Sequence, residues 1–262
     1  MRQLLPLLLI ALVFQACTSG KTDGFRVSGT LKDTSFTMLY LEEVRTADNQ
    51  PFVVDSTQPD SNGKFTLTAP EAEDQIFYLR ADKKGYPLCL LVNDSKSLEL
   101  TIQFEEMQGR MIPTYKVEGS PATEQVRAYS EKLNSWMMTY VNDLIALDTL
   151  TQKTGTPPDS LLNVVQTKSK GFLATTDSIL NKAITPSAYL MMMGFYQSIA
   201  SNASYRMQSF TLEEIAAKLD KLSARFPKHN GLAKIREQIK KDMQKSKGLV
   251  GQTAPEFTLP DQ

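Results

Sequence analysis

Histidine, the commonest general acid and base, and cysteine, the source of thiol chemistry, are rare in this 262-residue sequence. The only histidine is His229, and the only cysteines are Cys17 and Cys89. A Ser-His-Asp triad would have to depend on His229, which we interpret as a solvated linker residue at a helix boundary. One histidine and two cysteines are also too few for a zinc site, which usually takes several such ligands. The sequence therefore predicts no catalytic residue and no metal-binding residue.

Two acidic pairs, Glu42-Glu43 and Glu105-Glu106, are the remaining candidates for general acid–base catalysis. Both pairs lie near the ends of expected strands, where adjacent side chains point to opposite faces. Their carboxylates would not converge as a catalytic pair requires, so we predict that they are solvated charges. The sequence also has no Gly-x-Gly-x-x-Gly motif and no phosphate-binding loop. It therefore predicts no cofactor and no cofactor-binding residue.

Cys17 follows a segment that is typical of an export signal. Residues 1–16 begin with a positive charge, continue in an apolar run over residues 4–14 and end in a small residue. The apolar run is too short to span a bilayer as a stable helix. Phe14-Gln-Ala-Cys17 resembles a relaxed lipobox, which predicts cleavage after residue 16 and lipidation of Cys17, with residues 17–24 as a tether. The alternative is ordinary secretion with a free cysteine.

A lipidated Cys17 would anchor the protein to a membrane of the cell envelope, facing the periplasm. The sequence does not distinguish the inner from the outer membrane. It contains 29 lysine and arginine residues against 29 aspartate and glutamate residues, so its formal net charge is zero. Nucleic-acid-binding domains usually carry a basic patch, so we expect no nucleic acid as a partner.

Residues 25–119 show the period-two alternation of half-buried strands, separated by turn signals such as Asn62-Gly63, for which we expect a hairpin turn with positive φ. Regular spacing of this kind favours antiparallel strands over parallel strands with crossover helices. We therefore predict an antiparallel β-sandwich or open barrel. Cys89 lies in a run that is apolar on both faces, so we expect a buried structural side chain and not a reactive thiol. The expected strands cover residues 25–31, 38–42, 52–56, 65–67, 75–82, 88–92, 98–104 and 115–118.

Residues 120–247 change to the period of helices and predict a bundle-like helical region. The expected fold class is thus α+β, with the strands before the helices. Ser120 is a predicted N-cap with proline at the first helical position, and Thr211 with Glu214 forms a capping-box signature. The methionines of residues 191–193 are expected to fill a helical core. The five helices should begin near Ser120, Asp159 or Ser160, Thr185, Thr211 and Asn230, and we expect the side chain of Asp159 or Ser160 to cap the second helix.

Three segments resemble known families. Val54-Asp-Ser-Thr57 with Asn62-Gly-Lys-Phe65, and Val117-Glu-Gly-Ser120 ahead of a helix, resemble a domain of unknown function found in envelope lipoproteins before a thioredoxin-like domain. The third segment, at residues 251–259, resembles the lead-in to an AhpC/TSA-type thioredoxin-like domain. We therefore expect residues 248–262 to be a linker and the start of such a domain, which the sequence only begins.

The resemblance implies the non-catalytic N-terminal portion of a membrane-anchored thiol:disulfide oxidoreductase of the TlpA/ResA kind. No cysteine follows Cys89, so no Cys-x-x-Cys residue can be transferred from that family. The implied role is to position the redox domain or to recognise client proteins of the envelope, and the oligomeric state stays open. The alternative is a non-enzymatic envelope lipoprotein that binds a ligand or an envelope partner.

Overall fold

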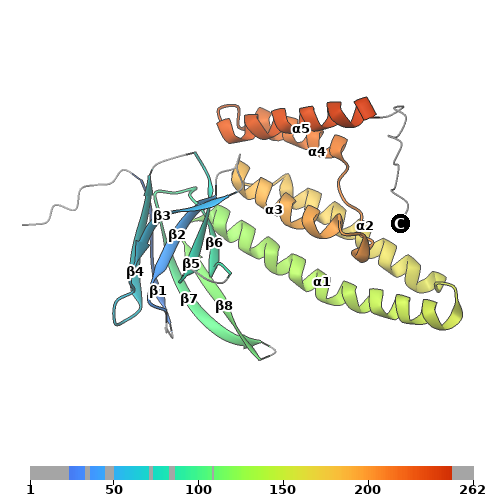
Figure 1. Ribbon diagram of the computed structural model, residues 1–262, viewed down its shortest axis with the longest axis horizontal. Helices are drawn as coiled ribbons and strands as arrows, with labels where there is room; N and C mark the ends of the chain where they lie inside the picture. Colours follow the sequence, from blue (N-terminus) through green and yellow to red (C-terminus); the bar gives the residue numbers. More distant parts are fainter. Residues whose placement is uncertain are drawn as a thin grey trace, which may run out of the picture.

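The computed structural model describes residues 24–32, 36–44, 50–70, 73–82, 86–107 and 109–249, without the side chains of residues 246–249. The expected signal peptide, Cys17 and the segment at residues 251–259 lie outside the described residues. Within the described residues, eight strands precede five α-helices and one 3-10 helix (Figure 1). The predicted α+β class, with strands before helices, is confirmed.

The eight strands form a sandwich of two four-stranded sheets. They are β1 (Gly24–Leu31), β2 (Leu39–Val44), β3 (Pro51–Thr57), β4 (Lys64–Pro70), β5 (Ile76–Ala81), β6 (Cys89–Val92), β7 (Ser97–Met107) and β8 (Arg110–Glu118). One sheet has the order β4-β1-β7-β8 and the other has the order β3-β2-β5-β6. In β1, alternate residues are buried in the core between the sheets, among them Phe25, Val27 and Leu31.

The sandwich is not purely antiparallel. β1 runs antiparallel to β4 but parallel to β7, with Val27 opposite Leu98. The antiparallel prediction is therefore wrong for the β1–β7 pair. Alternation of apolar residues determines which face of a strand is buried, but it contains no information about the direction of the neighbouring strand.

The turn before β4 has the positive φ expected of Asn62-Gly63, since Gly63 has a φ of 74°. Its hairpin interpretation is wrong, because β3 and β4 belong to different sheets. Asp60 organises the turn by accepting hydrogen bonds from the backbone N–H groups of Asn62 and Lys64, both at 2.8 Å. The backbone N–H of Leu31 donates to the Gly63 carbonyl at 2.9 Å, so the turn lies directly against β1.

Gly63→Ala should destabilise the protein more than Gly109→Ala. Both glycines have positive φ, but a Cβ at Gly63 would overlap the Leu31 carbonyl, whereas a Cβ at Gly109 would meet no atom within 4 Å. We expect the extra steric cost at Gly63 to be about 1 to 3 kcal/mol. Urea unfolding of the two variants measures it, and equal losses would contradict the close approach of Gly63 to β1.

The five α-helices are α1 (Pro121–Thr154), α2 (Asp159–Leu180), α3 (Pro186–Ala200), α4 (Leu212–Arg225) and α5 (Asn230–Leu249), and the 3-10 helix is η1 (Ala203–Tyr205). Ser120 caps α1 by accepting from Thr123 N, and Thr211 and Glu214 form a reciprocal capping box on α4. Both predictions are confirmed. The predicted side-chain cap of α2 is wrong: Pro158 occupies the N-cap position without a side-chain hydrogen bond, and Asp159 is the first helical residue.

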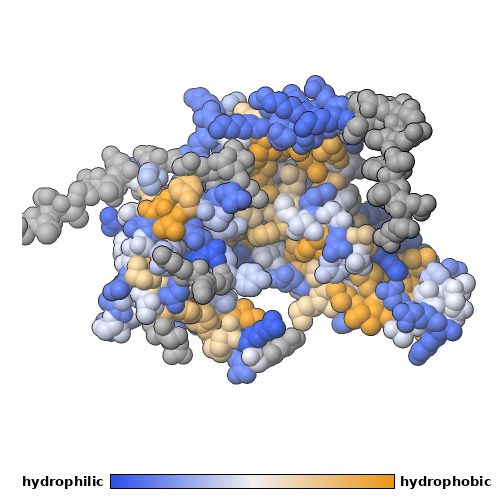
Figure 2. All heavy atoms as spheres, viewed as in Figure 1, coloured by the Kyte–Doolittle hydropathy of each residue, from blue (hydrophilic) through white to orange (hydrophobic). Residues whose placement is uncertain are grey.

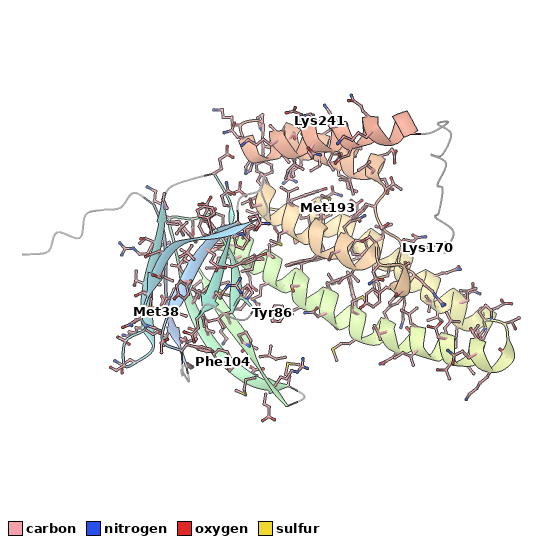
Figure 3. All side chains as sticks on the ribbon, in the orientation of Figure 1. Met38, Tyr86, Phe104, Lys170, Met193 and Lys241 are labelled. Atoms are coloured by element: carbon pink, nitrogen blue, oxygen red, sulfur yellow. The ribbon has the colours of Figure 1, made fainter. Side chains whose placement is uncertain are left out.

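Figure 1 shows α2 and α3 between the long helix α1 and the pair formed by α4 and α5. The core of this layer contains fully buried tyrosines, among them Tyr140 and Tyr196. Met192 and Met193 are also buried there, as expected, and Figure 3 shows Met193 on the side of α3 toward α4. Trp136 of α1 stacks on Phe172 of α2 with ring centroids 4.9 Å apart. The helices therefore pack around one continuous core.

Candidate functional site

The sandwich and the helices share an apolar cluster at their junction. Val44, Ile76 and Val92, which come from β2, β5 and β6, are buried in the same cluster as Val126 of α1 and Ala188 of α3. Figure 1 shows the N-terminal ends of α1 and α3 against this side of the sandwich. Because these side chains of the sheet are buried in the same cluster as the helices, the two parts stabilise each other.

The first polar link across the junction joins β6 to the start of α1. The hydroxyl of Thr123, a fully buried residue, accepts a hydrogen bond from Val92 N at 2.8 Å. Asp94 accepts from the backbone N–H of Ala122 at 2.8 Å. These bonds satisfy N–H groups that a helix start and a strand end would otherwise leave unpaired in the interior.

The second polar link is made by Glu73 and Asp74, which we call the acidic clamp. They are separated from β5 by one residue, Gln75. One carboxylate oxygen of Asp74 accepts from Ser187 N at 2.8 Å, and the Asp74 backbone carbonyl accepts from the Ser187 hydroxyl at 2.6 Å. The other carboxylate oxygen lies 2.8 Å from Nε2 of His229. Asp74 therefore holds the first turn of α3 and the residue that precedes α5.

Glu73 caps the start of α5. Its Oε1 accepts from Asn230 N at 2.8 Å, and its Oε2 accepts from Gly231 N at 3.2 Å. A helix N-terminus presents unpaired N–H groups and a positive end of the helix dipole, so a carboxylate is stabilising there. The acidic clamp thus places one negative charge on each of two helix N-termini.

His229 completes the cap of α5 and is not the solvated residue that we predicted. Its side chain is 7% exposed, and its Nδ1 accepts from Leu232 N at 3.0 Å. Nε2 is then the nitrogen that donates to Asp74. The prediction failed because the partner of His229 lies 155 residues away in the sequence.

The carboxylates and the imidazole shift one another's pKa. Burial by itself raises the pKa of Asp74, but the hydrogen bonds from His229 and Ser187 outweigh it, so the pKa is lowered. Burial likewise raises the pKa of Glu73, but the hydrogen bonds from the backbone of Asn230 and Gly231 outweigh it, so this pKa is also lowered. Burial lowers the pKa of His229, whereas Asp74 and Glu73 together raise it above its ordinary value. The junction therefore favours the ionised carboxylates of Glu73 and Asp74 and the protonated ring of His229.

The cluster has the residue types of a hydrolase triad but not its geometry. The Ser187 hydroxyl donates to the backbone carbonyl of Asp74 and is not placed to pass its proton to the His229 ring. Both ring nitrogens of His229 are also engaged, by Asp74 and by Leu232. The arrangement therefore caps and joins elements, and its chemistry is structural.

Cys89 and the acidic pairs lie elsewhere. Cys89 is 4% exposed between the sheets, and burial raises the pKa of its thiol, which confirms the structural interpretation. Glu105 and Glu106 are exposed, as predicted. Glu42 is not: its carboxylate oxygens both accept from Nε of Arg80 at 3.1 Å, and its side chain is 13% exposed. Cross-strand pairing of β2 with β5 brings these two residues together, which the sequence alone does not reveal.

An apolar groove of about 570 Å³ runs beside α1 toward the end of α3. Its lining includes Met138, which is 68% exposed, and Tyr205 of η1. Figure 2 shows hydrophobic residues on the visible face of α1. The complete lining is Asn134, Met137, Met138, Val141, Asn142, Ile199 and Tyr205.

Two further kinds of site are absent from the described residues. These residues contain no group of three or more His, Cys, Asp or Glu side chains arranged to hold a metal ion. Over the same part of the chain, no helix combines the length and the apolar character that crossing a membrane requires.

The sequence interpretation missed the acidic clamp. Glu73 and Asp74 stand in a polar stretch before a strand, where carboxylates are ordinary solvated residues. The available signal was at the other side of the junction, since Thr185 and His229 each precede a helix at a position where a polar cap is usual. That signal predicts a helix start, but it does not identify a carboxylate more than a hundred residues earlier as the partner.

Fold and junction together define a β-sandwich domain whose helical extension is built onto one side of it. A model of the family described as a domain of unknown function (DUF4369) matches residues 25–126. The match covers the sandwich and the first turn of α1, including the Thr123 link to β6. The expected N-terminal domain of unknown function is thereby confirmed. A search of curated proteins finds no match to the chain.

Proposed function

We propose that this chain is the non-catalytic N-terminal portion of a membrane-anchored thiol:disulfide oxidoreductase of the bacterial cell envelope. In this proposal Cys17 carries the lipid anchor, and the segment at residues 251–259 leads into a thioredoxin-like domain. The sandwich and the helices stand between the two. Their role is to hold the redox domain in a defined position relative to the membrane and to its client proteins.

The observation that best supports a positioning role is the clamped junction between sandwich and helices. A spacer can fix the orientation of a following domain only if its own parts do not move independently. Here a shared apolar cluster and the capping of α3 and α5 by Glu73 and Asp74 join the parts. α5 is the last described helix before residues 251–259, so the clamped element is the one from which a following domain would extend.

The proposal is tested first on the gene and then in cells. The coding sequence after Gln262 should encode a Cys-x-x-Cys pair within about fifty codons. In the complete protein, replacement of residues 25–247 by a flexible linker should leave membrane attachment through Cys17 intact but change the thiol oxidation state of envelope clients. A stop codon directly after Gln262, or unchanged client oxidation in that variant, contradicts the proposal. Cys17→Ser serves as the control that releases the protein from the membrane.

The alternative function is that of a non-enzymatic envelope lipoprotein that binds a ligand or an envelope partner. The apolar groove beside α1 is the observation that favours it, because an exposed methionine such as Met138 adapts to apolar partners. Ligand sites usually also contain a few fixed polar groups that orient the ligand. The polar side chains that line the groove are Asn134, Asn142 and Tyr205, and none of them is charged. We therefore prefer the positioning role.

A further inference from the structure

The hydrogen bonds of His229 are the part of the junction that a change in pH can rearrange. We propose that His229 is a protonation-dependent latch, which holds α5 to the sandwich more tightly when the imidazole is a cation than when it is neutral. The latch goes beyond the positioning role, because it makes the attachment of α5 to the sandwich depend on pH. It does not require a thioredoxin-like domain after α5, so the latch and the proposed function can be tested independently.

In the neutral ring, the two nitrogens have different roles. Nε2 donates to Asp74 across the junction at 2.8 Å. Nδ1 accepts from Leu232 N at 3.0 Å, which is a bond within the first turn of α5 itself. Nε2 also lies 3.3 Å from the backbone carbonyl of Asp74. In the neutral ring, only Nε2 therefore connects the helix to the sandwich.

In the cationic ring, Nδ1 carries a proton and can no longer accept from Leu232. The carboxylate oxygen that Nδ1 then faces is Oε2 of Glu73, at an ion-pair distance of 3.7 Å. Both nitrogens of the cation then face carboxylates of the acidic clamp, one through Asp74 and one through Glu73. Protonation exchanges a bond within α5 for an ion pair with Glu73 across the junction. It also makes the 2.8 Å bond from Nε2 to Asp74 a bond between two ions, and such charge-assisted hydrogen bonds are stronger than those of a neutral donor.

Besides the acidic clamp, four charged residues line the surface around the His229 ring: Arg225, Lys228, Asp220 and Arg236. Two surface depressions border His229, with volumes of about 390 and 300 Å³. Arg225 and Lys228 line the first, and Asp220 and Arg236 line the second. Arg225 donates to the carbonyl of Ala183 at 2.7 Å, and Arg236 donates to Asp220. From α3, Ser187 presents only neutral groups to Asp74.

The direction of the pH dependence is set by the pKa shifts. The pKa of His229 is raised above 6.5, so the cation's contribution is fully present below about pH 6.5 and is lost as pH rises through the raised value. The pKa values of Glu73 and Asp74 are lowered from 4.5 and 3.8, so their contribution is lost only as pH falls below those values. The latch should be tightest between about pH 4.5 and pH 6.5.

The direct test is nuclear magnetic resonance on protein prepared without a polyhistidine tag. His229 is the only histidine, so its ring signals need no assignment. We expect it to titrate with a midpoint above 6.5, and the amide signals of Gly231, Leu232 and Ser187 to shift with the same midpoint. A midpoint at or below 6.5, or a titration that leaves these amides unchanged, overturns the proposal.

Amide hydrogen exchange measures the hold on the helix itself. Relative to amides of α2, the protection of the first turns of α5 should be about threefold to tenfold greater at pH 5.5 than at pH 8, as expected when the donor of the bond to Asp74 becomes a cation. A ratio that does not change with pH overturns the proposal. The wild-type protein alone decides this point, whatever the variants do.

Two variants localise the effect. His229→Gln can still donate to Asp74 but cannot become a cation, so the pH dependence of α5 protection should disappear. Lys228→Gln removes the neighbouring charge and should leave the pH dependence intact. A His229→Gln protein that keeps the wild-type ratio, or a Lys228→Gln protein that loses it, assigns the effect to another group and contradicts the latch.

Discussion

Asp74→Ala should lower the free energy of unfolding by about 3 to 5 kcal/mol, the range observed when one partner of a buried ion pair is removed. The Asp74 side chain is 15% exposed and binds both Ser187 and His229. Its loss leaves the Ser187 N–H of α3 without its carboxylate acceptor and leaves the His229 ring beside an empty space. We expect a lower midpoint in urea unfolding, monitored by circular dichroism.

Glu237→Ala provides the matched control for this experiment. Glu237 is also a carboxylate on a charged partner, Lys241, but both side chains lie on the exposed surface of α5, and Figure 3 shows Lys241 on the outer side of that helix. The urea midpoint of this variant should be unchanged. If Asp74→Ala lowers the midpoint no more than Glu237→Ala does, the acidic clamp does not join the two parts of the protein.

Phe77→Ala should destabilise the helices as well as the sandwich in which it lies. The Phe77 side chain is fully buried between the sheets, with its ring centroid 5.2 Å from that of Phe25. Truncation of a buried phenylalanine costs about 3 to 5 kcal/mol. Trp136, the only tryptophan, lies in α1 and not in the sandwich. If the junction couples the two parts, the urea midpoint of the Trp136 fluorescence transition should fall, and the loss of unfolding free energy measured at Trp136 should equal the loss measured for the sandwich.

Tyr86→Ala is the control for Phe77→Ala, because it removes an aromatic ring of the sandwich that is 95% exposed. Figure 3 shows this side chain projecting from the strands. It should leave the Trp136 transition where it is. A Phe77→Ala protein with an unchanged Trp136 transition and a destabilised sandwich would mean that the helices fold independently.

Most elements of this fold could be predicted because their signals are local. The cap at Ser120 and the capping box at Thr211 and Glu214 depend on residues within one helical turn, and both are present as expected. The alternation in β1 likewise depends only on adjacent residues. The parallel pairing of β1 with β7 could not be predicted, because register and direction are decided by partners about seventy residues away.

The candidate site could not be predicted from the sequence for the same reason, because its residues are distant from one another in the chain. Glu73 and Asn230 are separated by 157 residues, and each has an ordinary polar neighbourhood in the chain. His229 was interpreted as solvated because a histidine between a lysine and an asparagine usually is. Only the fold shows that the segment before β5 meets the starts of two helices, and that its carboxylates replace water there.

Two intrinsic probes can test whether sandwich and helices form one cooperative unit, on which the positioning role depends. Cys89 is buried in the sandwich and Trp136 stacks in the helical layer. In a Cys17→Ser protein under increasing urea, thiol labelling of Cys89 and fluorescence of Trp136 should report the same midpoint. Labelling of Cys89 at a urea concentration where Trp136 is still native, or the reverse order, would contradict a single cooperative unit.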